Sequence, residues 1–212
     1  RGGSPALVCD ARSASGGSWS TDGTIYFAAS DGIRRVASTG GPSNIVFRSD
    51  TNQLLVRPSI SPDQRHLAFT DYTTAVLIGD VQTHAVHVVS NAAYDLLFVS
   101  PDLVTYTRDG SAHDPALYLQ RVDATNPKLL GTPIQIAEQV RSAWNRMSYT
   151  VSQEGTLVYL PGADLSMPLV ANRRGEVIDT IHQNGVSSLR VLQSRSGLVL
   201  SGDGGVWRYD PA

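Results

Sequence analysis

Residues 18–27 read SWSTDGTIYF, a polar turn followed at once by a run of strand-forming residues. Ser20, Asp22 and Gly23 favour a tight turn, because Ser and Asp side chains accept backbone hydrogen bonds and Gly tolerates a left-handed backbone. The residues that follow, 24–28, carry the β-branched and aromatic side chains typical of strands. This stretch therefore predicts a turn that leads directly into a short β-strand.

The same turn recurs along the whole chain. Its first position is a serine in five segments, with spacings of 41, 39, 52 and 42 residues: Ser20, Ser61, Ser100, Ser152 and Ser194. An acidic residue follows two positions later in four of the five segments. A fixed period of about 40 residues indicates a repeat architecture. We therefore interpret these serines as structural turn residues and not as nucleophiles.

Each repeat also contains strand-like segments after the turn. The segments directly after it are residues 24–28, 66–70, 104–107, 156–160 and 198–201. Third-strand segments follow at residues 33–36, 76–80, 117–120, 169–172 and 206–210, and fourth-strand segments at 44–47, 86–89, 134–137 and 177–181. Four short strands in about 40 residues are the signature of a propeller blade. The sequence predicts an all-β protein, a β-propeller of four-stranded antiparallel blades.

The fifth repeat ends after its third strand, whereas residues 6–10 (ALVCD) form an extra strand-like segment near the start. We predict that this segment completes the last blade and closes a five-bladed ring, which leaves no unpaired edge at the junction. The expected domain covers residues 1–212, with blades at approximately 16–47, 54–90, 94–137, 143–182 and 185–210. The alternative is a fragment of a larger ring, and the start without Met indicates a piece of a longer protein.

Composition excludes several classes of protein. The chain has 16 Arg and 16 Asp but only one Lys and three Glu, so it lacks the residues that usually cover exposed helices. Its formal net charge of −2 argues against nucleic acid as a partner. No apolar run approaches the roughly 20 residues of a membrane-spanning helix, so we expect no membrane insertion. The single Cys9 has no internal disulfide partner, and we predict no cofactor and no metal.

Three segments resemble the repeats of TolB-like, WD-like bacterial propellers. They are the run 16–27, the turn 61–63 and residues 35–42, which read RVASTGGP. The resemblance covers nearly the whole chain and is strongest to propellers found C-terminal to bacterial serine/threonine protein kinases. It implies a propeller that serves as a sensor or scaffold module of a larger bacterial protein. The compartment stays open, with an extracytoplasmic position in a membrane-anchored parent protein as one alternative. Two features depart from the family: the third repeat is about ten residues longer, and five repeats are fewer than the usual six.

Ligands of propellers bind by default at the mouth of the central channel, where loops between second and third strands and loops between blades open on one face. The residues predicted to bind a ligand there are Arg57, Tyr72, Asp109, His113, Asp114, Arg141, Trp144, Arg146 and Arg190. Arg beside Trp or Tyr can hold a carboxylate, a sugar or a peptide. The alternative is that these arginines pair with nearby Asp. The loop 109–115 (DGSAHDP) is the most distinctive, although Asp-Gly and Asp-Pro are also ordinary turn residues.

Catalytic motifs are not evident. The chain has no Gly-x-Ser-x-Gly motif, and the predicted innermost segments 56–60, 96–99, 147–151 and 188–193 contain no Asp or Glu. We therefore favour a non-catalytic, monomeric recognition module that binds a peptide, a protein or a small-molecule ligand at the channel mouth. The alternative is a small propeller hydrolase acting on esters rather than glycosides through a loop serine and His113. Trp19, which aligns with Ile60 of the next repeat, is predicted to pack between blades.

Overall fold

The computed structural model describes residues 7–50, 54–71, 75–108, 115–143, 146–161, 167–172, 174–183, 186–191, 198–202 and 205–209. All regular secondary structure in these ranges is β-strand. None of the described residues belongs to a helix long and apolar enough to cross a membrane. The prediction of an all-β protein is confirmed.

Four antiparallel four-stranded sheets follow one another along the chain. The first consists of β1 (Gly17–Trp19), β2 (Thr24–Ala29), β3 (Gly32–Ala37) and β4 (Asn44–Arg48). The second consists of β5 (Leu55–Ile60), β6 (His66–Asp71), β7 (Val76–Asp80) and β8 (Val86–Ser90). The third consists of β9 (Tyr94–Ser100), β10 (Leu103–Arg108), β11 (Ala116–Asp123) and β12 (Lys128–Ala137). The fourth consists of β15 (Tyr149–Val151), β16 (Leu157–Tyr159), β17 (Leu169–Ala171) and β18 (Val177–Thr180).

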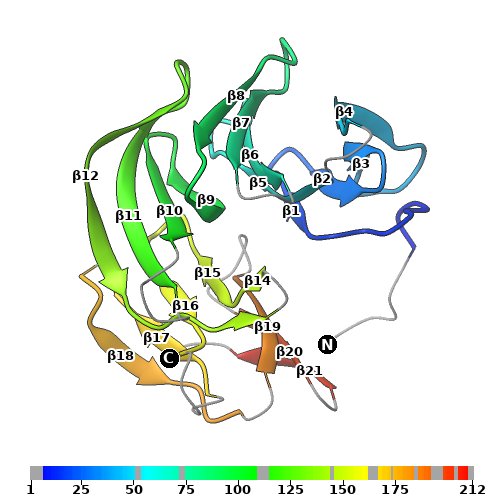
Figure 1. Ribbon diagram of the computed structural model, residues 1–212. Helices are drawn as coiled ribbons and strands as arrows, with labels where there is room; N and C mark the ends of the chain where they lie inside the picture. The colour runs from blue at the N-terminus through cyan, green and yellow to red at the C-terminus, as the bar shows by residue number, and fades with distance from the viewer. Residues whose placement is uncertain are drawn as a thin grey trace.

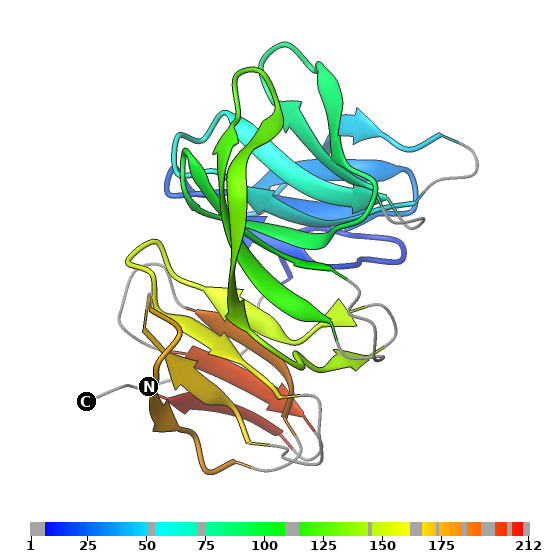
Figure 2. The ribbon, with the colours of Figure 1, turned by 60° about the vertical axis from the view of Figure 1, so that its left-hand side comes forward.

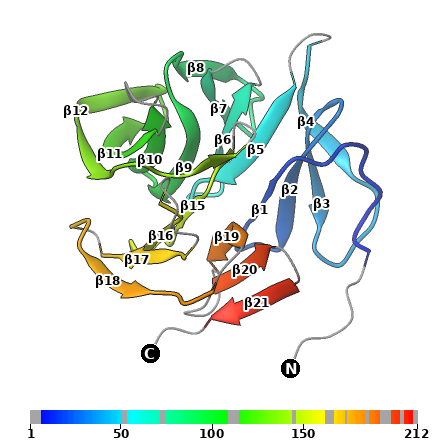
Figure 3. The ribbon, with the colours of Figure 1, turned by 60° about the horizontal axis from the view of Figure 1, so that its bottom comes forward.

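The last sheet has three described strands, β19 (Val186–Val191), β20 (Leu198–Gly202) and β21 (Gly205–Tyr209). The five sheets are arranged around a common centre (Figures 1 and 3), and the first strand of each lies innermost. The inner strands β1, β5, β9, β15 and β19 contact one another in sequence order, except that no β19–β1 contact of comparable extent occurs in the described residues. This is the architecture of a β-propeller, with sheets packed face to face like blades.

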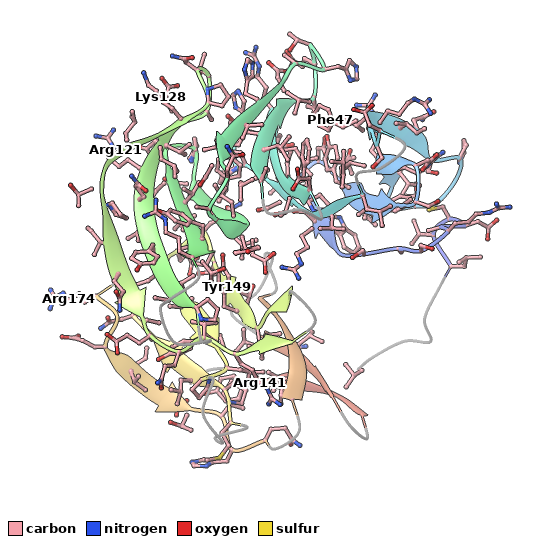
Figure 4. All side chains as sticks on the ribbon, in the orientation of Figure 1. Phe47, Arg121, Lys128, Arg141, Tyr149 and Arg174 are labelled. Carbon is pink, nitrogen blue, oxygen red and sulfur yellow. The ribbon has the colours of Figure 1, made fainter. Side chains whose placement is uncertain are left out.

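The core lies between neighbouring sheets. Phe47 of β4 is buried, and its ring centroid lies 5.1 Å from that of Phe69 on β6 in the second sheet (Figure 4). The same ring fills the space above Gly79 on β7, where an added Cβ would lie 2.4 Å from the ring. Small and large residues therefore alternate across this interface, which is how facing layers reach close packing.

The recurring turn has the predicted structural role. Ser20 N donates to Thr24 O at 2.8 Å, and Ser152 N donates to Thr156 O at 2.8 Å. The fourth position is left-handed in the first, second and fourth turns, with φ of 86° at Gly23, 61° at Gln64 and 85° at Gly155. The turn is therefore stabilised by backbone hydrogen bonds between the two strands it joins.

The extra length of the third repeat lies in two hairpins. β11 and β12 are 8 and 10 residues long and form an extended ribbon (Figure 2), and β12 also contacts β8 of the second sheet. A separate two-stranded hairpin follows, formed by β13 (Ser142–Ala143) and β14 (Arg146–Met147). This small hairpin was not predicted, because its two-residue strands are too short to produce a periodic pattern.

The predicted N-terminal strand is wrong for its described part, residues 7–10. These residues form no strand, and Val8 O accepts a hydrogen bond from Gly41 N at 3.2 Å, in the β3–β4 connection of the first sheet. Val8 and Cys9 pack against a buried cluster that contains Phe27 and Val36. The segment therefore covers an apolar face of the first sheet.

The prediction for Trp19 is also wrong. Its side chain is 57% exposed at the end of β1, whereas the aligned Ile60 is 7% exposed. On the same face of the ring, His66 is buried, and its Nδ1 lies 2.6 Å from Asp63 Oδ2 within the second turn.

Candidate functional site

The inner strands of the first three sheets share a backbone irregularity near their first residues. Gly16, which precedes β1, has φ of 83°, Arg57 on β5 has φ of 57° and Asp95 on β9 has φ of 53°. The pairing of β5 with β6 shifts between Val56 and Ser59, and that of β9 with β10 shifts near Asp95. Left-handed backbone is unfavourable for residues with a Cβ, and such bulges re-aim side chains.

The bulges bring two opposite charges together. The Arg57 guanidinium forms an ion pair with the Asp95 carboxylate, across the boundary between the second and third sheets. The two side chains are only 17% and 7% exposed. Because the two charges compensate each other, the pair can occupy a largely buried position. A single unpaired charge would be unfavourable there, because burial removes it from water.

Further hydrogen bonds connect this ion pair to the first and fourth sheets. Arg57 N donates to Ser15 O at 3.1 Å, in the segment that leads into β1. On the other side, the buried Tyr149 of β15 donates its hydroxyl to Asp95 O and lies 3.3 Å from Thr105 O. Tyr149 lies near the centre of the ring (Figure 4), and its burial raises its pKa well above the usual value, so the hydroxyl stays protonated.

A second cluster of polar groups lies at the same end of the third sheet. The Arg108 guanidinium at the end of β10 stacks over Tyr106 and Tyr118, at 5.4 and 5.8 Å from the two ring centroids. The rings are themselves stacked, with centroids 5.9 Å apart. Arg108 Nε is buried and has no hydrogen-bond partner among the described residues. Cation–π contacts of this kind stabilise a guanidinium over an aromatic ring.

The structure describes only some of the predicted site residues. Tyr72, Asp109, His113, Asp114 and Trp144 lie outside the described residues, and Arg146 and Arg190 are described only through their backbones in β14 and β19. Arg141 is exposed just before β13, and its backbone pairs with Leu160 and Ser148 (Figure 4).

Among the predicted site residues, the structure describes a side-chain partner at the centre of the ring for Arg57. This arginine pairs with Asp95, as the alternative interpretation of the arginines predicted.

The sequence analysis missed Asp95, Tyr149 and Arg108. Asp95 was missed because the innermost segment was expected to start at residue 96, whereas β9 begins at Tyr94. The sequence did contain a signal for Asp95. Arg57 precedes the turn serine Ser61 by four residues, and Asp95 precedes Ser100 by five, so a bulge with one extra residue places the two at equivalent positions of their strands.

The described residues at the centre of the ring bond to one another. Arg57 and Asp95 neutralise each other, and the Tyr149 hydroxyl donates to backbone carbonyl groups. No cluster of three or more His, Cys, Asp or Glu suited to a metal ion occurs among the described residues. These contacts connect the inner strands of neighbouring sheets to one another.

Solved β-propeller structures are similar to this chain in fold. A chain in the crystal structure of the mitotic checkpoint complex matches with a TM-score of 0.66 and 12% identity, over 93% of this chain and 76% of that chain. The Cps50 (Swd1) propeller domain of Myceliophteria thermophila matches with 0.59 and 13%, over 91% and 64%. An oligogalacturonate lyase in complex with manganese matches with 0.60 and 14%, over 89% and 58%.

At such low identities the structural similarity shows the fold alone. The chain spans less than two thirds of the length of the last two propellers. No protein-family model matches the sequence, and no curated protein matches it either.

Proposed function

We propose that this protein is a recognition propeller that binds a protein or peptide partner at the mouth of its central channel. The observation that carries the proposal is the Arg57–Asp95–Tyr149 network, which links the inner strands through groups already bonded to each other. A rigid ring with variable loops around its mouth is a typical recognition scaffold. The predicted site residues on those loops, among them Tyr72, His113 and Trp144, would supply the contacts.

The similar structures support an interaction role. Two of the matching propellers come from structures named for the mitotic checkpoint complex and for Swd1, and the first is an assembly of proteins. We further propose one domain over residues 1–212 with five blades, the fifth built on β19–β21. The resemblance to TolB-like repeats favours a sensor or scaffold module of a larger bacterial protein.

Selection from a displayed library of random peptides on the immobilised chain tests the proposal. We expect selected peptides to bind at least tenfold more weakly to Tyr72→Ala, His113→Ala or Trp144→Ala. Gln82→Ala, an exposed residue in the β7–β8 turn on the opposite face, is the matched control and should bind as the unsubstituted chain does. Peptides that bind all four variants equally would contradict recognition at this mouth.

The second candidate is an enzyme acting on esters or carbohydrates, supported by the fold similarity to an oligogalacturonate lyase. One inner-strand carboxylate, Asp95, is consistent with such chemistry in position, but its described partner is Arg57 and not a second carboxylate. A panel of ester and glycoside substrates distinguishes the two candidates. Turnover that is lost in His113→Ala would favour the enzyme over the binding module.

A further inference from the structure

A groove lies on the face of the ring that carries the recurring turns, opposite the predicted mouth. Three sheets contribute to it through their inner-strand turns: residues 19–21 of the first, residues 60–62 and Gln64 of the second, and Gln153 of the fourth. The groove is shallow and open to solvent, so a ligand ring would lie over it and not inside it.

One wall of the groove is aromatic. Trp19 lines it and is 57% exposed, in a chain whose other turns carry Ile60, Val99, Val151 and Gln193 at the aligned position. A large exposed aromatic ring is costly to leave in water and is a common platform for stacking. Since Trp19 does not pack between sheets, its exposed ring is available to a ligand.

Gln64 is held at the groove in an unfavourable backbone conformation. Its φ is 61°, at the turn position where the first and fourth repeats have Gly23 and Gly155. A glutamine there is more strained than a glycine, so its side chain must contribute something in return. It bridges the two turns: Gln64 Oε1 accepts from Ser20 Oγ at 3.2 Å, and Gln64 Nε2 donates to Thr21 Oγ1.

Ser61 supplies a polar atom without a partner. Its residue is 1% exposed and lines the groove, and its Oγ makes no hydrogen bond with any described residue. Buried hydroxyl groups in native proteins nearly always have a partner, so each exception needs an explanation. A hydroxyl ligand in the groove would supply one, because Ser Oγ can both donate and accept.

We propose that this groove binds a neutral saccharide, with one pyranose ring stacked on Trp19. All described residues that line it are uncharged, and most carry hydroxyl or amide groups. A pyranose ring matches this chemistry, because it has an apolar C–H face for the indole and a rim of hydroxyl groups for Ser61 and Gln64. The site is separate from the proposed protein-binding mouth and does not depend on it.

The test uses the whole chain and NMR of its three tryptophan indole N–H groups. The peak of Trp19 is assigned with Trp19→Phe, which changes an exposed residue and should fold. Probes are methyl β-glucopyranoside, methyl β-galactopyranoside, N-acetylglucosamine and cellotriose, with galacturonic acid as the anionic comparison and hexaproline as the peptide comparison. We expect at least one neutral sugar to shift the Trp19 peak saturably while the other two indole peaks stay in place.

Two variants test the contacts. Gln64→Gly removes the amide and relieves the left-handed strain, so it should fold at least as well yet bind the sugar about tenfold more weakly. Ser61→Ala should weaken binding about fivefold, whereas Ser100→Ala, the aligned serine outside the groove, should leave it unchanged. The proposal is overturned if no neutral sugar shifts the peak, if both groove variants bind normally, or if galacturonic acid or hexaproline binds in preference.

Discussion

The Arg57 guanidinium pairs with the Asp95 carboxylate between the inner strands of two neighbouring sheets, and both residues have left-handed backbones. The unfavourable φ values are local costs at two positions. They persist because the bulges turn both side chains into one buried contact at the centre of the ring. A local backbone defect in each sheet is thereby linked to the packing of the sheets against each other.

Breaking this pair from one side should destabilise the protein strongly. Arg57→Gly suits the left-handed position but leaves Asp95 buried without its ion-pair partner, at a cost of about 3 kcal/mol in the free energy of unfolding. The double variant Arg57→Gly/Asp95→Gly removes both charges and keeps both backbones permissive. Urea unfolding of the single and double variants should show that the two effects are less than additive. Additive losses would mean that the pair does not couple the sheets.

Tyr149→Phe should lower the free energy of unfolding by about 1–2 kcal/mol, because Asp95 O and Thr105 O lose a donor in a buried position. The effect also has a pH signature. The pKa of Tyr149 is raised by burial, so its contribution is complete below the unfolded pKa of about 10 and is lost as the pH rises further. Urea midpoints measured from pH 8 to 11 should fall less steeply for the variant than for the unsubstituted chain.

The repeat made most of the strands predictable, since turn and strand residues recur at positions such as Ser20, Ser61 and Ser152. The contacts between sheets were not predictable in this way. Arg57 and Asp95 lie 38 residues apart, and their pairing depends on a one-residue difference in where each bulge falls. The packing of Val8 against the first sheet was not predictable either, because it depends on which apolar face the assembled ring leaves uncovered.

Gly79→Ala should destabilise the interface between the first two sheets by about 1–3 kcal/mol, because the new Cβ would overlap the ring of Phe47. Phe47 also packs on Phe69, so the ring has little room to move away. Gly131→Ala is the comparison: nothing lies within 4 Å of its added Cβ, so its loss comes from the left-handed backbone with φ of 70°, a cost that Gly79→Ala does not carry. Thermal unfolding of both variants reports the two costs separately, and an unchanged stability of Gly79→Ala would contradict a tight Phe47–Gly79 contact.

Asp80→Asn should make the protein's stability less sensitive to acid. The hydrogen bond from Arg65 at 2.8 Å, with further bonds from Gln82 N and Thr83 N, holds the pKa of Asp80 well below its usual value. A depressed carboxyl pKa stabilises the fold above the unfolded pKa of about 4, and this stabilisation is lost as the pH falls toward the folded pKa.

Urea midpoints between pH 5 and pH 2 should therefore fall less steeply for Asp80→Asn than for the unsubstituted chain. The asparagine oxygen can still accept the two backbone hydrogen bonds, so the turn itself should remain. Asp123→Asn is the matched control, because Asp123 accepts the same pair of backbone bonds from Thr125 and Asn126 but forms no ion pair with a described arginine. A pH profile of Asp80→Asn that matches those of the unsubstituted chain and the control would show that the Arg65 contact does not persist in solution.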